Sequence, residues 1–375
     1  MGIKDLNATV KKYGDANIFK TVNAEEMKGK RFAVDISIFI CSFAMTSQDA
    51  WFNTMTNFLI SFIKYKVNVI IVFDGKNVPK EKLVERELRK TNQQNQKARV
   101  DKLKFFKEKL MLRCFEGDEI KLVPESLQEE FKEVFKRSKT DDINPKDAED
   151  VLTFVQERVD KAEQAAEGIQ AHHKTMTREL VKALGLPYIQ ADGEAEHLAA
   201  SMAYQGMVDG VISRDTDTLC YGCPLLVTDI KGGKFSYVEL KDMLATLKMT
   251  MEQFVDLCIC LQCDYNHRMP KNGPAAVYNA IHKYGGIDQW KEASPDKPFH
   301  LLKYNRCRDI FRPYSKRYFF GDRKKCKIRR KKEVDVEVLD RLFDSVNSRY
   351  TGDYIKGVME GKFTASYMGN HTSII

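Results

Sequence analysis

The fold of this chain is decided by the segment Val67-Asn-Val-Ile-Ile-Val-Phe-Asp-Gly75, a run of β-branched and aromatic residues that ends in an acid and a glycine. Such a run predicts a buried strand of a parallel sheet. A second strand is predicted at Arg31-Phe-Ala-Val34, directly before Asp35, and the amphipathic stretch 51–65 predicts the helix that connects the two strands. Successive strand–helix units favour an open α/β sheet with right-handed connections.

The α/β pattern resumes after about residue 174. Helices predicted at 176–184 and 194–205 alternate with strands predicted at 186–189 and 208–213. This alternation extends the parallel sheet that the first strands begin.

Between the two α/β stretches lies a segment of different composition. Residues 80 to about 180 are rich in lysine and glutamate and helical in period, so we expect a helical insertion into the sheet rather than a linker. Breaks in this insertion are expected at 114–118 and 140–145, and the pair His172-His173 is expected on a helix surface.

Acidic residues stand at the ends of the predicted elements. Because ligands of an open parallel sheet bind at the carboxyl ends of its strands, these side chains are expected to converge on one crevice. Clustered carboxylates repel one another strongly, and a pair of divalent cations such as Mg²⁺ is the natural counter-charge. The predicted metal ligands are Asp35, Asp74, Glu194, Glu196, Asp215, Asp217 and Asp264.

The overall charge points to an anionic partner in spite of these acids. The chain has 375 residues, of which 43% are hydrophobic and 30% charged, and a net charge of +8. Between Lys303 and Lys332 there are fourteen lysines and arginines against two acids. A surface of this kind suits contact with a nucleic-acid backbone, although a solvated basic face is the plainer alternative.

No segment of the sequence predicts secretion or membrane insertion. The amino terminus lacks the pattern of a signal peptide, and no apolar run approaches the ~18–20 residues of a membrane span. The nine cysteines therefore predict reduced thiols and an intracellular protein. Cys220-x-x-Cys223 and Cys260-x-x-Cys263 have the spacing of a zinc site, but the apolar density of 254–263 favours a buried helix instead.

Helices are also predicted at 251–262 and 274–284, joined by a tight turn that ends at Gly273. Proline at the first position of the second helix leaves backbone N–H groups free to hold a phosphate. A helix–turn–helix without any ligand is the alternative.

Together these segments resemble the flap endonuclease/XPG family of structure-specific 5′ nucleases. The resemblance covers residues 1–90 and about 170–285, and it implies a PIN-like, mostly parallel central sheet with helices on both faces, a helical arch insertion and a helix–two-turn–helix. The motifs that carry it, in order, are Met1-Gly-Ile-Lys-Asp-Leu6, Val34-Asp35, Val72-Phe-Asp-Gly75, Ala191-Asp-Gly-Glu-Ala-Glu196, Val208-Asp-Gly-Val-Ile-Ser-Arg-Asp-Thr-Asp217, and Phe254-Val-Asp-Leu-Cys258 with Cys263-Asp-Tyr265 and Gly273-Pro274.

The resemblance implies a metal-dependent 5′ flap endonuclease or 5′–3′ exonuclease that cuts branched, flapped or nicked DNA in replication, repair or recombination. Two Mg²⁺, for which Mn²⁺ can substitute, would be its cofactors. Asp35, Asp74, Glu194 and Glu196 would serve the first ion, and Asp215, Asp217 and Asp264 the second. The implied domains are a nuclease region 1–90, a helical arch 91–173, a second nuclease region 174–290 with the helix–two-turn–helix, and a basic C-terminal region 291–375.

The family's arch carries two basic residues, seven positions apart, that meet the scissile phosphate. Lys82 and Arg89 have this spacing, one residue further from Asp74 than is usual, and Arg86 is a rival on the same face. Gly2, Lys271 and Gly273 are further expected DNA contacts. The insertion is longer than a compact flap-endonuclease arch, and Cys41 stands where the family has an aromatic or histidine that stacks on a base.

Two other functions are open at this stage. A PIN-type ribonuclease also clusters acids at strand ends, but such domains usually lack the helix–two-turn–helix. A catalytically inactive DNA-junction binding protein should have lost metal ligands, and none is missing here. We expect a monomer without membrane contact. No clear sliding-clamp motif is present, since 313–320 lacks the glutamine, and the basic run 323–332 is compatible with a nuclear or a cytoplasmic protein.

Overall fold

The computed structural model describes residues 2–46, 50–116, 119–136, 143–320, 327–330 and 333–361. It leaves undescribed the side chains of Thr46, Leu83, Val84, Arg86, Leu88, Gln164, Ala165, Glu167 and Phe320. The chain divides into two compact units. The first unit comprises Met1–Phe43, Asp49–Glu85 and Ala171–Ile375, and the second comprises Ala44–Gln48 and Arg86–Gln170. The four domain boundaries expected from the sequence stay a prediction.

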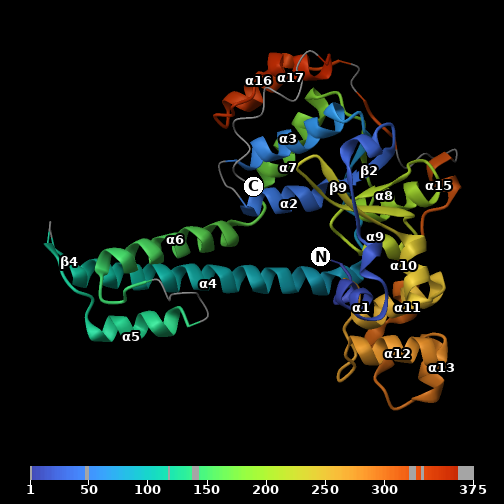
Figure 1. Cartoon of the computed structure of the whole chain (residues 1–375), viewed down its shortest axis with the longest axis horizontal. Coiled ribbons are helices and arrows are strands. Elements are labelled where there is room, and N and C mark those ends of the chain that lie inside the picture. The colour runs from blue at the N-terminus through green and yellow to red at the C-terminus, as the bar shows by residue number, and fades with distance from the viewer. Residues whose placement is uncertain are drawn as a thin grey trace. The chain divides into compact units, whose positions relative to one another are not determined.

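The first unit contains the sheet (Figure 1). Its strands are β1 (Lys20–Asn23), β2 (Arg31–Asp35), β3 (Asn68–Phe73), β6 (Tyr188–Gln190), β7 (Gly210–Ile212), β8 (Leu225–Lys231) and β9 (Lys234–Glu239). Its helices are α1 (Leu6–Tyr13), α2 (Ile36–Thr46), α3 (Trp51–Lys64), α7 (Ala171–Ala183), α8 (Ala195–Tyr204), α9 (Asp217–Cys220), α10 (Leu240–Leu247), α11 (Met251–Leu261), α12 (Pro274–Tyr284), α13 (Ile287–Ala293), α14 (Tyr304–Ile310), α15 (Lys316–Phe320), α16 (Val336–Asp344) and α17 (Gly352–Met359), with short 3₁₀ turns at Ala16–Ile18, Ala24–Met27, Lys80–Lys82 and Phe299–Leu302.

The sheet is mostly parallel, as predicted. Its strand order is β1-β9-β8-β7-β2-β3-β6 among the described residues. The pairs from β8 through β7, β2 and β3 to β6 are parallel, whereas β9 runs antiparallel to both β8 and β1. The antiparallel edge and helix α1 are absent from the sequence-based prediction.

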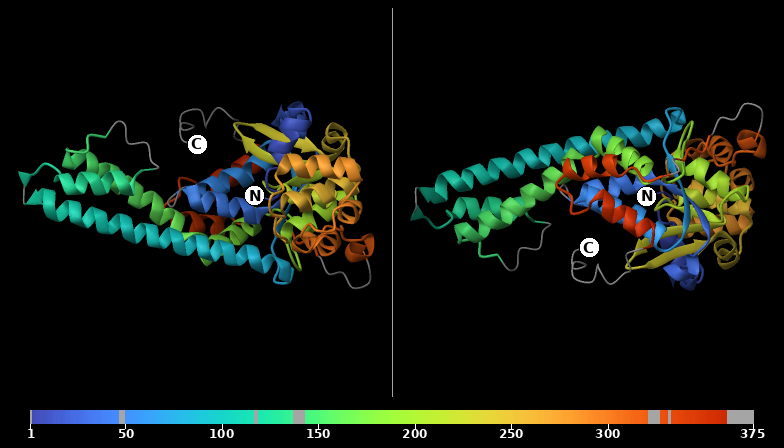
Figure 2. Two further views of the ribbon diagram at one scale, coloured as in Figure 1. Left: turned by 90° about the horizontal axis from the view of Figure 1, so that it is seen from below. Right: turned by 90° about the horizontal axis from the view of Figure 1, so that it is seen from above.

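Helices cover both faces of the sheet, which confirms the predicted architecture. Phe32 and Val34 of β2 point into a core shared with α3, α7, α16 and α17. Ala33 of β2 and Val72 of β3 point into a second core, shared with α8, α10 and α11. Figures 1 and 2 show α3 and α7 on one side of the strands and α8 on the other. Burial on both faces explains why the central strands are apolar at nearly every position.

The second unit is the helical insertion. It consists of α4 (Leu83–Cys114), the short strands β4 (Phe115–Glu116) and β5 (Glu119–Ile120), α5 (Glu125–Val134) and α6 (Ala148–Glu167). An aromatic cluster of Phe106, Phe131, Phe135 and Phe154 forms its core. The break expected at 114–118 falls at the β4–β5 pair, and residues 117–118 and 140–142 of the two expected breaks lie outside the described residues.

One surface prediction is wrong. His173 is 7% exposed and packs edge-on against the Trp51 ring at 4.6 Å between ring centres, whereas His172 is exposed. The cause is tertiary, since α7 packs on α3 and turns this face of the helix inward. Separately, none of the helices in the described part of the chain combines the length and the apolar character that a membrane crossing requires.

Candidate active site

The topology places the predicted acids at one edge of the sheet. Asp35 ends β2, and Asp74 directly follows β3. Glu194 is the residue before α8, which follows β6. Because these strands are parallel, their carboxyl ends face the same way. A hydrogen bond from the backbone N–H of Ala195 to Asp74 Oδ1, at 3.0 Å, joins the end of β3 to the start of α8.

The aspartates after β7 join the same cluster. Ser213 donates to Asp35 Oδ2 at 3.3 Å, and the backbone N–H of Asp217 donates to Asp215 Oδ1 at 3.1 Å. Burial, followed by repulsion from Asp264, raises the pKa of the Asp215 carboxyl.

Burial and mutual repulsion raise the pKa of several of these acids. Burial raises the pKa of Asp35 to about 8, with further contributions from Asp74 and Asp215. Burial, followed by repulsion from Asp215, raises the pKa of Glu196 well above its ordinary value. The pKa of Asp217 is raised well above its ordinary value by burial and then by Asp215 and Asp264. The structure therefore brings the seven acids together, while their role as metal ligands stays a prediction.

Lys82 supplies a counter-charge inside this cluster. Its ammonium forms ion pairs with Glu194 Oε1, with Asp264 Oδ2 at 3.4 Å and with Glu196 Oε1 at 3.5 Å. Burial alone would lower the pKa of Lys82, but Glu196, Glu194 and Asp264 outweigh it and raise that pKa. One monovalent ammonium balances only part of the negative charge of seven carboxyl groups.

The donor chemistry of the site fits a hard divalent cation. In the described residues, no three histidine, cysteine, aspartate or glutamate side chains stand ready to hold a metal ion as they are now placed. However, both carboxylate oxygens of Asp217 are buried without a hydrogen-bond partner among the described groups. Unpartnered buried oxygens of this kind are costly, and an all-carboxylate set is the type that Mg²⁺ and Mn²⁺ prefer. Replacement of the Lys82 ammonium by cations would therefore complete the site.

The stability of the metal-free protein is expected to fall as the pH rises from about 6 to about 8. The pKa of Asp35 is about 8 in the folded protein against an ordinary 3.8. Protonation of Asp35 therefore favours folding at low pH, and this contribution is lost as the pH rises through the folded-state pKa, at up to about 1.4 kcal/mol per pH unit for each such proton. Thermal unfolding in EDTA should show the slope, and both Mg²⁺ and Asp35→Asn should flatten it. A metal-free protein that gains stability over this range would contradict the assignment.

Gly2 lies against the acidic cluster. Its φ is +90°, and a Cβ at this position would lie 2.2 Å from Asp215 Oδ1 and 2.6 Å from Thr216 Oγ1. The next residue is anchored by a hydrogen bond from the backbone N–H of Ile3 to Thr216 Oγ1 at 3.0 Å. Only glycine fits here without displacing Asp215.

Gly2→Ala is therefore expected to slow cleavage by roughly 10²-fold, since displacement of a reacting group by about 1 Å has effects of this size. The measurement is kcat on a 5′-flap substrate. Gly29→Ala is a matched control, because Gly29 also has a positive φ, but a Cβ added there would meet no described atom within 4 Å. Equal rates for the two variants would show that the contact with Asp215 is unimportant.

The other predicted DNA contacts are more dispersed. Lys271 is exposed in the turn between α11 and α12, with φ +60°. Gly273 immediately precedes α12, and Pro274 occupies the first helical position as predicted. Arg89 is exposed on α4 in the second unit, and the side chain of its rival Arg86 lies outside the described residues. The roles of these four residues stay predictions.

The cysteines of the zinc-like motifs lie in the core. Cys258 and Cys260 are buried in α11, as the favoured interpretation expects, with Cys263 just beyond it. Burial raises the thiol pKa of Cys260 well above its ordinary value, and Cys223 donates to the carbonyl oxygen of Leu225. These thiols behave as small apolar side chains.

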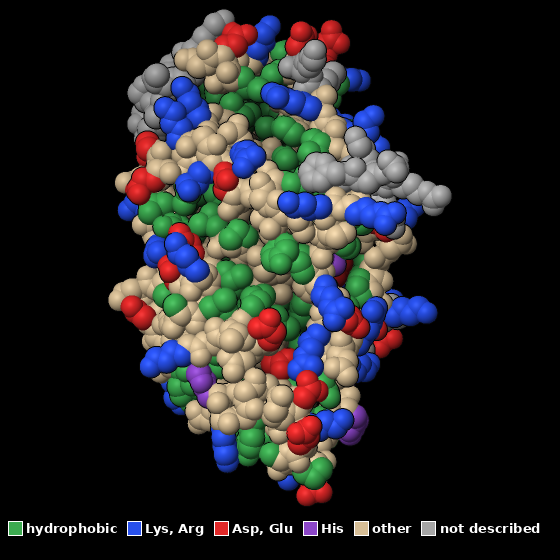
Figure 3. Space-filling view, turned by 90° about the vertical axis from the view of Figure 1, so that its right-hand side faces the viewer, with side chains coloured by type: hydrophobic (Ala, Val, Ile, Leu, Met, Phe, Trp, Pro, Cys, Tyr) green, Lys and Arg blue, Asp and Glu red, His purple; other side chains and the backbone are tan. Residues whose placement is uncertain are grey.

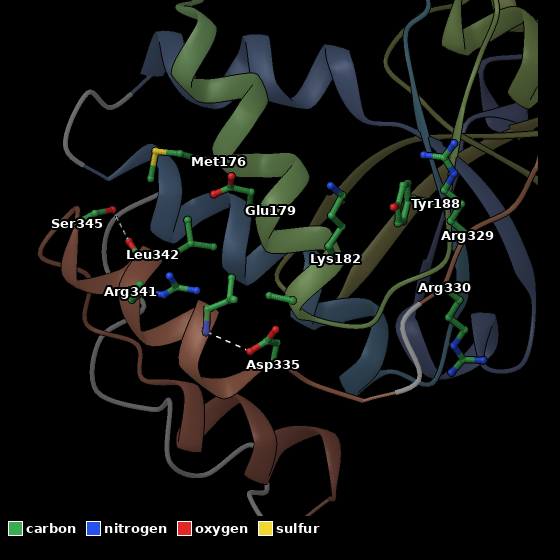
Figure 4. A pocket seen from close by; sticks show the side chains of 12 residues that line it. Met176, Glu179, Lys182, Tyr188, Arg329, Arg330, Asp335, Arg341, Leu342 and Ser345 are labelled. Carbon is green, nitrogen blue, oxygen red and sulfur yellow. Dashed lines mark hydrogen bonds between the residues drawn. The ribbon is translucent and has the colours of Figure 1, made fainter.

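Basic residues line a groove that includes none of the seven clustered acids. The groove has a volume of about 850 Å³ and lies between α7 and α16 (Figure 4). Arg329 forms an antiparallel backbone bridge with Tyr188, at 2.8 Å in both directions. Four cations line the groove against two acids, namely Lys182, Arg329, Arg330 and Arg341 against Glu179 and Asp335. Of the basic run 323–332, only residues 327–330 are described.

Some cations of the C-terminal region form ion pairs elsewhere in the fold. Arg308 binds Asp256 at 2.6 Å and Asp288 at 2.8 Å, which ties α14 to α11 and α13. On the face shown in Figure 3, lysines and arginines are interspersed with acidic side chains and form no single continuous basic area. The expected concentration of positive charge is therefore partly used inside the fold.

Parts of this chain match known protein domains. The XPG N-terminal domain matches residues 1–98, and the XPG I-region matches residues 185–264. Flap endonuclease 1 of Lodderomyces elongisporus is 25% identical over 337 residues, which cover 83% of this chain and 75% of that protein. Flap endonuclease 1 of Arthroderma otae is 34% identical over 170 residues, which cover 42% of this chain and 43% of the relative.

A solved structure supports the same fold. The catalytic core of Rad2 in complex with DNA substrate has a TM-score of 0.59 and 16% identity, over 96% of this chain and 100% of that chain. The two matched family domains contain all seven acids. The chain belongs to the flap endonuclease/XPG family of structure-specific 5′ nucleases.

Proposed function

We propose that this chain is a structure-specific 5′ nuclease that hydrolyses phosphodiester bonds of branched, flapped or nicked DNA, with two Mg²⁺ ions as cofactors. Its relatives are named flap endonucleases, and the Rad2 core is in complex with DNA substrate. The observation that carries the proposal is the cluster of buried carboxylates around the ammonium of Lys82. Work in DNA replication, repair or recombination is part of the same proposal.

The acids have a proposed division of labour. Asp35, Asp74, Glu194 and Glu196 would hold one cation, and Asp215, Asp217 and Asp264 the other. When bound, such cations lower the pKa of water and neutralise charge that develops on the phosphate. The protein scaffold holds the carboxylates close together against their mutual repulsion, and no side-chain nucleophile is required.

Lys82 and Arg89 are proposed to contact the scissile phosphate. Lys82 shares the oxygens of Glu194, Glu196 and Asp264 with the proposed metal site. Its ammonium must therefore give way when cations bind, and it is then available to a phosphate group. Electrostatic stabilisation by a correctly placed cation is often the largest single contribution to such a reaction.

The test is a panel of end-labelled substrates, namely 5′-flap, gapped, nicked and blunt DNA and single-stranded RNA, each with Mg²⁺, Mn²⁺ or EDTA. Junction-specific cleavage that requires the cation is the expected result. Equal cleavage of unstructured RNA would favour a PIN-type ribonuclease, and tight junction binding without any cleavage would favour an inactive junction-binding protein. Either outcome would overturn the proposal.

We propose that the protein works as a monomer and without a sliding clamp. We also propose an intracellular location, nuclear or cytoplasmic. No disulfide joins the cysteines that the structure describes, in keeping with a reducing compartment.

A further inference from the structure

Two tyrosines form a hydrogen-bonded chain to the proposed metal-binding glutamates. Tyr265 donates its hydroxyl proton to Glu194 Oε2 at 2.5 Å, and the same hydroxyl lies 3.4 Å from Glu196 Oε1. The hydroxyl of Tyr221 lies 2.7 Å from that of Tyr265. Both rings are buried, with 0% and 1% exposure. Tyr265 lies in the motif Cys263-Asp-Tyr265, but nothing in the local sequence marks either tyrosine as a partner of acids far along the chain.

The direction of the hydrogen bonds follows from a count of protons. A phenol has one proton to donate, and Tyr265 donates that proton to Glu194 Oε2. Because that proton is already donated, the hydroxyl of Tyr221 must donate to the hydroxyl of Tyr265. A chain of this kind is polarised along its length, so the first bond strengthens the second.

The hydrogen bond from Tyr265 occupies only one of the two carboxylate oxygens of Glu194. Oε2 is held by Tyr265, while Oε1 faces the ammonium of Lys82. Glu194 directly precedes α8, and its side chain does not cap the helix. The hydrogen bond from Tyr265 is therefore what fixes the carboxylate, with its second oxygen turned toward the position of a cation.

A stacked column of aromatic rings packs against the ring of Tyr221. Its ring lies 4.5 Å from that of His197, which lies 4.0 Å from the ring of Tyr314, with angles of 15° and 21° between the planes. Tyr318 extends the stack at 4.0 Å from Tyr314. Phe311 contacts both tyrosines of the pair edge-on. The column thus connects the glutamates to residues 311–318, far along the chain.

Polar contacts attach this segment to α8, the helix that carries Glu196. The backbone N–H of Tyr314 donates to Ser201 Oγ at 2.8 Å, and Gln205 donates to the carbonyl oxygen of Tyr314 at 2.9 Å. Nearby in the sequence, Arg306 forms an ion pair with Glu81 at 2.9 Å. Glu81 is the residue before Lys82, so the same region also contacts the turn that carries the catalytic lysine.

We propose that residues 304–318 form a positioning element for the metal-binding glutamates, and that Tyr221 and Tyr265 are the positioning residues through which it acts. The inference rests on the proposed metal-dependent function. It assigns a role to a region that lies beyond both matched family domains, which end at residues 98 and 264. Outer partners of metal ligands typically change metal affinity or activity by 10–100-fold when they are removed.

The hydroxyl pair is tested with Tyr221→Phe and Tyr265→Phe in the full chain. We expect Tyr265→Phe to weaken Mn²⁺ binding, measured calorimetrically without DNA, by about 10-fold. The Mg²⁺ concentration needed for half-maximal flap cleavage should rise by the same factor, with KM for DNA unchanged. Tyr221→Phe should act in the same direction but less. The double variant should be no weaker than Tyr265→Phe alone, because Tyr221 acts only through Tyr265.

The column is tested with Tyr314→Ala and the conservative Tyr314→Phe. Tyr314→Phe keeps the stacked ring and should bind Mn²⁺ like the wild type, whereas Tyr314→Ala should bind it more weakly. Tyr278→Phe is the matched control, since its hydroxyl donates to the carbonyl oxygen of Leu247 and its ring stacks on Tyr13.

Two results would overturn the inference. One is a Tyr265→Phe variant with Mn²⁺ affinity within about twofold of wild type, well short of the effect of losing an outer ligand partner. The other is equal behaviour of Tyr314→Ala and Tyr314→Phe. A wild-type protein that binds Mn²⁺ but cuts no branched DNA would instead refute the proposed function, and the affinity comparison would still decide the inference.

Discussion

Asp217→Asn is expected to slow cleavage of a 5′-flap substrate by roughly 10³-fold or more, which exceeds the effect of losing a hydrogen-bond partner of a metal ligand. The same change should make the metal-free protein more stable. Asp217 is completely buried, and its two carboxylate oxygens lack hydrogen-bond partners in the described part of the chain. Burial and then repulsion from Asp215 and Asp264 raise its pKa well above the ordinary value. Asparagine removes this repulsion, but it also removes an anionic ligand.

The gain in stability should grow with pH. A carboxyl whose pKa is raised in the folded state favours folding below its ordinary pKa, and that contribution is lost as the pH rises through the raised value. Asparagine does not titrate, so the variant lacks the loss of stability that Asp217 causes over this range, whereas the losses caused by Asp35 and Glu196 remain. The difference in free energy of unfolding should be on the order of 1–3 kcal/mol near pH 8 and smaller near pH 6.

Urea unfolding in EDTA at the two pH values measures this difference, and single-turnover cleavage measures the rate. Asp242→Asn is a suitable control, because it removes a partly exposed ion pair with Lys20 far from the acids and should change neither quantity much. A variant that is less stable than wild type in EDTA, or one that cuts at the wild-type rate, would remove Asp217 from the proposed site.

Lys82→Ala is expected to slow cleavage by roughly 10²–10³-fold at saturating DNA, as for the loss of other preorganised electrostatic groups, with little change in DNA affinity. The same change should destabilise the metal-free protein, by up to about 3 kcal/mol, because three carboxylates lose their ammonium partner. The loss is limited because the acids can take up protons instead. Mg²⁺ should restore the stability, and it should do so at a lower concentration than in the wild type, since no ammonium competes for Glu194, Glu196 and Asp264.

Thermal unfolding across a Mg²⁺ titration distinguishes competition between Lys82 and the cation from a purely structural role of Lys82. Lys80→Ala is the control, since Lys80 lies in the same 3₁₀ turn and is exposed. If Lys82→Ala weakened DNA binding while the rate at saturation stayed normal, Lys82 would belong to the DNA-binding surface and not to the active site.

Local pattern was sufficient for the central strands and for several helices. The runs that end at Asp35 and Asp74 form β2 and β3 because strands buried on both faces must be apolar throughout, and that signal is contained in a few adjacent residues. Helix α11 was likewise predictable, with its amino-terminal boundary marked by the capping box of Thr250 and Gln253. The β8–β9 hairpin is missing from the prediction, although Gly232-Gly233 between the two strands is a turn signal that could have revealed it.

Contacts between distant parts of the sequence could not be predicted in the same way. The inward orientation of His173 depends on Trp51, and the support of Glu194 depends on Tyr265 and Tyr221. In each case the partners are separated by many residues, so no periodicity or spacing connects them. The position of Lys82 among the acids is of the same kind.

The sequence by itself determined that strand ends carry acids and that these acids belong to a nuclease of the flap endonuclease/XPG family, because strand-forming runs and short motifs are local properties. Only the tertiary structure decided how the site is held. It placed an ammonium among the carboxylates, buried Asp217 without a partner among the described groups and brought residues 304–318 against α8. These features arise from packing, which joins residues according to shape and charge rather than according to their distance along the chain.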